Sequence, residues 1–153
     1  PTVSGIQVNG LSTDGAAPLR FGDSLDRALE ITGWTAVYPC SYAHEDPQTV
    51  TAIDLPVGWE EPPLSLFFHR GQFAMLTLKF ASPYSTVPGI TIGSPRSEVL
   101  ANVDGLEQSQ AGALTLGSAP TSLAFSVGSN PSDPVNSIAI SRSRDIWPNA
   151  GLC

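Results

Sequence analysis

Hydrophobic residues follow two different periods along this chain. In residues 25–32 and 99–103 they recur at steps of three and four, which is typical of short helices with one buried face. Over most of the remaining apolar stretches they alternate with polar residues, which is typical of strands. Each helical stretch closes at a glycine, Gly33 or Gly105, a residue that commonly ends helices.

The two helical stretches belong to a motif that occurs twice. Residues 19–29 read Leu-Arg-Phe-Gly-Asp-Ser-Leu-Asp-Arg-Ala-Leu, and residues 90–100 read Ile-Thr-Ile-Gly-Ser-Pro-Arg-Ser-Glu-Val-Leu, so that Gly22 corresponds to Gly93. Glycine followed by Asp-Ser or Ser-Pro predicts a turn that leads into a helix, because Ser and Asp accept hydrogen bonds from free backbone N–H groups and proline fits the first turn. The duplication predicts two related halves.

Strand-like segments follow each predicted helix. The expected strands are 50–55, 64–69 and 73–80 in the first half and 113–116, 123–127 and 135–141 in the second half. The short connection Arg70-Gly71-Gln72 predicts a hairpin in which glycine can adopt a positive φ. We therefore expect an α+β fold made of two helix-then-antiparallel-sheet repeats that share one sheet and one core.

The predicted repeats divide the chain near its middle. The first repeat, with an N-terminal extension, covers residues 1–82, and the second, with a C-terminal tail, covers residues 83–153. Two prolines and a glycine interrupt the periodicity in residues 81–89, which indicates a seam between the halves. Each half has only about 70 residues, too few for a comfortable core of its own, so we expect one compact unit.

Charge and hydropathy exclude several functional classes. The net charge is −7, the chain has seven Lys and Arg residues, and Lys79 is the sole lysine. Nucleic-acid binding is therefore not expected, because the sequence offers no basic cluster for a phosphate backbone. A membrane span is not expected either, since no run of about 18 apolar residues occurs. The start at Pro1 fits a mature chain whose signal or lipid-anchor segment has been removed.

The two cysteines, Cys40 and Cys153, lie far apart in the sequence. We expect them to form a disulfide that ties the C-terminal tail to the first half; the alternative is two unrelated thiols. A bridge that closes a loop of about 100 residues would stabilise the fold by about 4–5 kcal/mol. If the bridge forms, the protein belongs to an oxidising compartment and is secreted or part of the cell envelope.

Candidate catalytic and metal-binding groups are few. Adjacent side chains such as those of His44, Glu45 and Asp46 point in different directions and do not converge on one metal ion, so a solvated loop is the simpler reading. His69 lies next to a predicted hairpin tip, and the pair Glu60-Glu61 precedes two prolines, which favours a loop. No catalytic residue, metal site or cofactor is predicted.

Aromatic residues give a better indication of a binding surface. Most aromatic side chains are expected in the core, but several lie in irregular, proline-interrupted segments, where aromatic residues can anchor a protein partner. The candidate binding residues are Trp34, Tyr38, Tyr42 and Trp59, flanked by Glu45, Asp46, Glu60 and Glu61. Such an acidic rim favours a basic protein partner. The alternative is that these rings close one end of the core.

The duplicated motif resembles the tandem repeat of the beta-lactamase inhibitory protein and of related small outer-membrane-assembly lipoprotein domains. The resemblance rests on Phe21-Gly22-Asp23-Ser24 with Ala28-Leu29, and on Ile92-Gly93-Ser94-Pro95 with Val99-Leu100. It implies a repeat of helix and antiparallel sheet, and a protein that binds its partner outside the cytoplasm.

The sequence therefore predicts a non-enzymatic protein-binding module that is secreted or part of the cell envelope. One alternative is an inhibitor of an extracellular enzyme. Another is a hydrolase whose site is assembled only in the folded chain.

Overall fold

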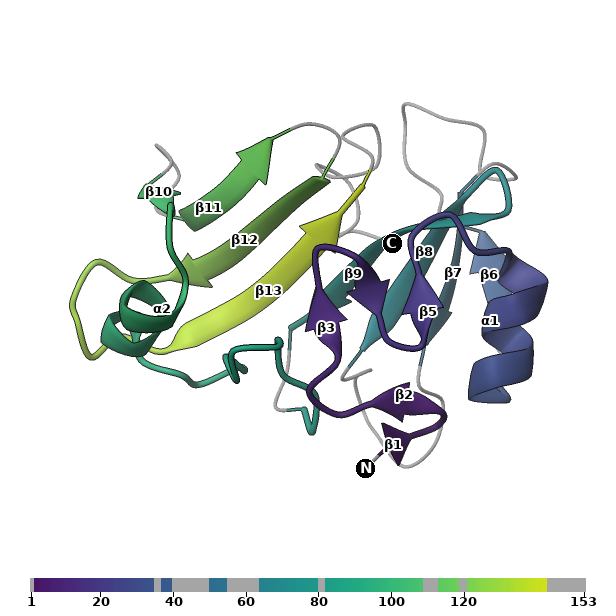
Figure 1. The fold of residues 1–153 in the computed structure, drawn as a ribbon, viewed down its shortest axis with the longest axis horizontal. Coiled ribbons are helices and arrows are strands. Elements are labelled where there is room, and N and C mark those ends of the chain that lie inside the picture. Colours follow the sequence, from purple (N-terminus) through teal and green to yellow (C-terminus); the bar gives the residue numbers. More distant parts are fainter. Residues whose placement is uncertain are drawn as a thin grey trace.

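The fold is built on one antiparallel sheet of eight strands in the order β10-β11-β12-β13-β9-β8-β7-β6 (Figure 1). The computed structural model describes residues 2–34, 37–39, 50–54, 64–79, 82–108, 113–118 and 121–142. The strands of the first half are β6 (Val37–Pro39), β7 (Val50–Asp54), β8 (Ser65–His69) and β9 (Gln72–Leu78). Those of the second half are β10 (Glu107–Gln108), β11 (Ala113–Ser118), β12 (Thr121–Val127) and β13 (Val135–Ser141). The two sets meet where β13 pairs with β9.

One row of aliphatic side chains crosses seven strands of this sheet. Residues that lie directly opposite each other in an antiparallel pair project from the same face, so the row marks one face as the core face. Its members, in order from β11 to β6, are Leu116, Leu123, Ile140, Leu76, Leu66, Ile53 and Val37. The middle of the row is fully buried, whereas Val37 at one end is 40% exposed.

Five two-residue strands precede the first helix; in Figure 1 the last three, β3 to β5, lie in front of the middle of the sheet, and the first two lie near its lower edge. They are β1 (Thr2–Val3) and β2 (Ile6–Gln7), which pair with each other, and β3 (Leu11–Ser12), β4 (Gly15–Ala16) and β5 (Leu19–Arg20), which form a second small sheet. The β1–β2 turn has a positive φ at both Ser4 and Gly5, the geometry that matches the twist of a tight hairpin. Ile6, Leu11 and Leu19 point inward and are buried.

Two helices lie beside this N-terminal layer in the described chain. Helix α1 (Leu25–Thr32) begins at Ser24, whose Oγ accepts a hydrogen bond from the N–H of Arg27 at 3.1 Å, and ends at Gly33, which has a φ of 69°. Helix α2 (Arg96–Asn102) follows Pro95 and buries Val99. Neither helix is long or apolar enough to span a lipid bilayer.

The predicted α+β class is wrong, because strands dominate the described chain. The two helices have eight and seven residues, and the sheet system contains thirteen strands. The chain is not an arrangement of two helix-then-sheet repeats, since α1 is preceded by the β1–β5 layer and the segment 82–95 before α2 has no named strand. Two-residue strands are too short to produce a detectable alternation, which is why the sequence did not reveal them.

Candidate functional site

A pocket of about 240 Å³ opens on the core face of the sheet, between α2 and β3. Its floor is the end of the aliphatic row, formed by Leu116, Leu123 and Ile140. In Figure 1 the layer β3–β5 lies in front of the middle of the sheet and α2 lies over its second half. Residues of β3 and of the end of α2 line the pocket together with this floor. Ile140 is fully buried, but Leu123 retains 7% of its surface and Leu116 is half-buried.

The first wall of the pocket joins the two halves of the chain. Leu11 and Ser12 come from β3, and Thr86, Val87 and Pro88 come from the turn that leads toward α2. The N–H of Val87 donates to the carbonyl oxygen of Leu11 at 2.9 Å, and the N–H of Leu11 donates to Ser85 at 3.3 Å. These backbone bonds hold the wall as one unit. Val87 is 65% exposed, more than Val37 and Leu100, the other exposed large hydrophobic residues among the described ones.

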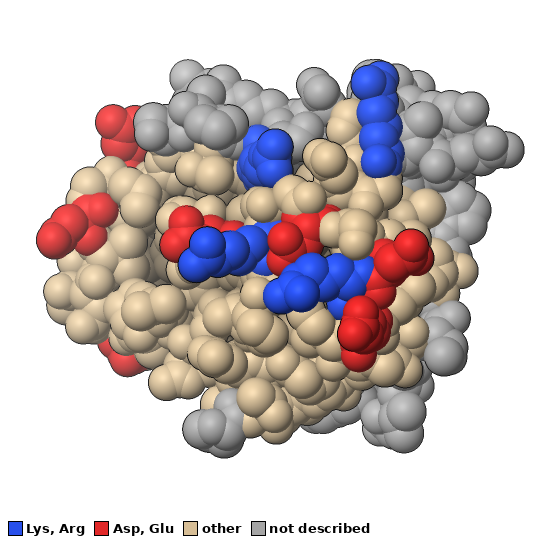
Figure 2. Space-filling view, turned by 45° about the vertical axis from the view of Figure 1, so that its right-hand side comes forward, with Lys and Arg blue, Asp and Glu red and all other residues tan. Residues whose placement is uncertain are grey.

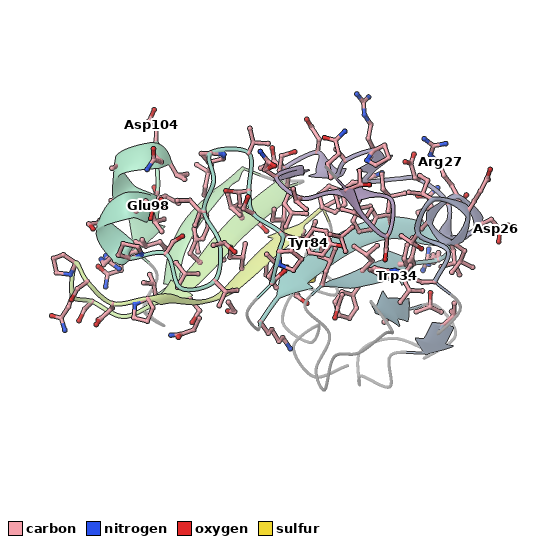
Figure 3. All side chains as sticks on the ribbon, turned by 90° about the horizontal axis from the view of Figure 1, so that it is seen from below. Asp26, Arg27, Trp34, Tyr84, Glu98 and Asp104 are labelled. Carbon is pink, nitrogen blue, oxygen red and sulfur yellow. The ribbon has the colours of Figure 1, made fainter. Side chains whose placement is uncertain are left out.

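The opposite wall is the C-terminal end of α2. Val103 and Asp104 line the pocket there, next to Asn102, the last residue of the helix. The N–H of Val103 donates to the carbonyl oxygen of Val99 at 3.0 Å, and Asn102 Nδ2 donates to the carbonyl oxygen of Glu98 at 2.8 Å. Both bonds fix the wall to the helix. In Figure 3, Asp104 and Glu98 extend from α2 on the side away from the sheet.

The lining of the pocket is largely apolar. Seven of the twelve lining residues are aliphatic or proline, and Asp104 is the one ionisable residue among the twelve. Its polar side chains are Ser12, Thr13, Thr86, Asn102 and Asp104. Within the described chain, His, Cys, Asp and Glu side chains form no group of three suited to a metal ion. The pocket can bury an apolar group next to one carboxylate.

Basic and acidic side chains are mixed on the face of the molecule that carries α1 (Figure 2). Arg27 Nε lies 3.3 Å from Asp23 Oδ2, which also accepts the N–H of Arg20 at 2.8 Å. Because carboxylates stand among the arginines, this face offers no uniformly positive surface.

The predicted aromatic surface is not assembled in the described part of the chain. Trp34 is only 3% exposed and belongs to the hydrophobic core, so its ring does not face solvent (Figure 3). Its indole N–H has no hydrogen-bond partner among the described residues. The backbone of Tyr38 forms part of β6, but the side chain lies outside the described residues. The other predicted residues that lie outside them are Tyr42, Trp59, Cys40, Cys153, His44, Glu45, Asp46, Glu60 and Glu61.

The sequence does not predict the pocket, because the residues that line it come from six separate stretches of the chain. The expected strand 123–127 includes Leu123 and the seam 81–89 includes Val87, but neither pattern indicates that these side chains meet. One usable signal was present: Val87 and Pro88 interrupt a polar turn with apolar surface.

The comparisons with known proteins give one structural neighbour and no family. No protein-family model and no curated protein matches the sequence. The chain is similar in structure to an extracellular protein containing a SCP domain from Bacillus anthracis str. Ames, with a TM-score of 0.53 and 12% sequence identity. The match covers 94% of this chain and 50% of the neighbour, so the chain spans about half of that protein's length. The two proteins share a fold; the resemblance to the beta-lactamase inhibitory protein stays a prediction.

Proposed function

We propose that this chain is a non-enzymatic, extracytoplasmic module that binds another protein through the pocket between α2 and β3. The observation that supports it most is the lining of the pocket, which combines an aliphatic floor with an exposed Val87 and a single carboxylate. Exposed aliphatic surface beside a rigid apolar cleft is typical of an interaction site.

The location outside the cytoplasm is supported by the structural neighbour, which is described as extracellular. The oxidising compartment that a Cys40–Cys153 bridge would require agrees with this proposal. A binding role suits a chain that corresponds to half of a longer neighbour, because modules of this size commonly accompany other domains.

The proposal is tested by capture from a secreted or cell-envelope extract, followed by identification of the retained proteins. Three baits are compared: the wild type, Val87→Ser, and Leu100→Ser as the matched control. Both substitutions remove an exposed aliphatic side chain, but Leu100, which is 48% exposed on α2, does not line the pocket. We expect a partner that is retained by the wild type and by Leu100→Ser and is released from Val87→Ser.

Three outcomes would overturn the proposal. Equal retention by all three baits would place the binding site elsewhere, and the absence of any retained protein would argue against a protein-binding role. Turnover of a substrate in a panel of hydrolase assays would show that the protein is an enzyme.

One further result would identify the partner. Inhibition of a secreted hydrolase by the wild type, weakened by Val87→Ser, would show that the partner is an enzyme and that the module is its inhibitor.

A further inference from the structure

We infer that the pocket takes one apolar side chain of a partner protein together with an adjacent Lys or Arg. This inference rests on the proposed function and specifies the chemistry that the pocket selects. Two features support it: the floor of the pocket is aliphatic, and the one charged residue of the lining, Asp104, is negative.

The size of the pocket limits what it can hold. Its volume of about 240 Å³ is below the roughly 300–1,000 Å³ that is usual for cofactors and other small-molecule ligands. A single Leu, Met or Phe side chain fits this space and would contact Leu116, Leu123 and Val103. Burial of such a side chain is the main source of affinity expected here.

The charges around the pocket favour a cation beside that side chain. Asp104 stands on the rim, and no lining residue carries a positive charge. The last turn of α2, which forms one wall, contains no basic residue either. A Lys or Arg next to the bound side chain would therefore be attracted by the carboxylate of Asp104, whereas an Asp or Glu would be repelled.

The rim charge is exposed, so its effect is moderate and sensitive to salt. Asp104 is open to solvent, and attraction between exposed charges is weak and screened by ions. The apolar contact should therefore set the affinity, and the rim should set the choice among partners.

The test uses four short synthetic peptides and follows backbone amide signals of the folded protein by NMR. The peptides are Gly-Ser-Leu-Arg-Ser-Gly and versions in which Leu is replaced by Ser, Arg by Gln, or Arg by Glu. We expect the Leu-Arg peptide to shift the amide signals of residues 11–13, 86–87 and 102–104. Replacement of Leu should weaken binding about tenfold or more, since a buried aliphatic side chain is lost. Replacement of Arg by Gln should weaken it about twofold to fivefold.

Matched protein variants separate the charge effect from the apolar contact. Asp104→Asn should reduce the preference for Arg over Gln, and Glu98→Gln should leave it unchanged, because Glu98 carries the same charge on α2 but does not line the pocket. The preference should also fade when the salt concentration rises from about 20 mM to about 500 mM.

The outcomes distinguish this inference from the proposed function. Equal binding of the Arg and Glu peptides would overturn the preference for a cation next to the bound side chain. The binding of an apolar side chain in the pocket would still be supported. If no peptide shifts the pocket residues while Val87→Ser still releases a captured partner, the inference is wrong and the binding role holds. If neither experiment shows binding at the pocket, both are wrong.

Discussion

The phenol of Tyr84 donates a hydrogen bond to the backbone carbonyl oxygen of Val3 across 2.8 Å. The two residues are 81 positions apart in the sequence. Tyr84 is fully buried, and its own carbonyl oxygen accepts a bond from Thr91 Oγ1 at 2.8 Å. Tyr84 therefore connects the first hairpin to the segment that supplies Val87 to the pocket wall (Figure 3).

Removal of this hydroxyl should weaken the fold. Tyr84→Phe keeps the ring but leaves the carbonyl oxygen of Val3 without the phenol, so we expect a loss of about 1–2 kcal/mol in the free energy of unfolding. Urea titration measures this loss. An unchanged dependence of the free energy of unfolding on urea concentration would show that only the stability has changed. A variant as stable as the wild type would mean that water replaces the phenol at no cost.

The same tyrosine predicts a loss of stability at alkaline pH. Burial raises the pKa of Tyr84 from 10.0 to about 12 in the folded protein. The unfolded chain then releases this proton first, so the contribution to stability is complete below pH 10 and is lost as the pH rises through about 12. The stability difference between the wild type and Tyr84→Phe should therefore narrow over this range. A constant difference from about pH 8 upward would contradict the raised pKa.

Two glycines with the same backbone angle should respond very differently to alanine. Gly5 and Gly71 both have a φ of 78°, a strained value for a residue with a side chain. A Cβ at Gly5 would overlap the carbonyl oxygen of Ile31 in α1, whereas a Cβ at Gly71 has no atom within 4 Å. We expect Gly71→Ala to cost about 1 kcal/mol from backbone strain alone.

Gly5→Ala should cost clearly more than Gly71→Ala, because α1 and the first hairpin must also move apart. Thermal unfolding of the two variants side by side measures the difference. Equal melting temperatures would show that the contact between Gly5 and α1 is not part of the stable fold.

The local elements were predictable from the sequence because their signals are short-range. Gly22 and Gly93 both precede a helix with φ values of 97° and 92°, and each donates its N–H to a strand of the main sheet, at Phe73 and Val135. The strands predicted after each helix are also present within a few residues. The hairpin predicted at Arg70-Gly71 is confirmed, with Gly71 at a positive φ.

The arrangement of those elements depended on contacts that no local pattern encodes. The β1–β5 layer consists of two-residue strands whose pairing follows from turns such as Ser4-Gly5. The predicted arrangement of two helix-then-sheet repeats did not include this layer. The pocket is bordered by β3, by the end of α2 and by the floor that contains Leu116 and Leu123. Such a space is decided by tertiary packing, which no local pattern of residues predicts.

Two leucines of the same row, Leu66 and Leu116, should differ in their contribution to stability. Leu66 is fully buried under the N-terminal layer, and Leu66→Ala would leave a closed cavity, which costs about 2–5 kcal/mol. Leu116 is half-buried and lines the open pocket, where water can enter the space that the substitution leaves. We expect Leu116→Ala to cost about 1 kcal/mol, because only part of the side chain is removed from water in the folded state.

Chemical denaturation of Leu66→Ala and Leu116→Ala provides the comparison. Equal losses would mean that Leu116 is as tightly enclosed as Leu66, and the pocket floor would then be closed in solution. We expect Leu116→Ala to be the more stable variant, because the two leucines lie at different places in one row. The side chain of Leu66 fills space in the closed core and is needed for folding, whereas the side chain of Leu116 borders an open pocket that a ligand can enter.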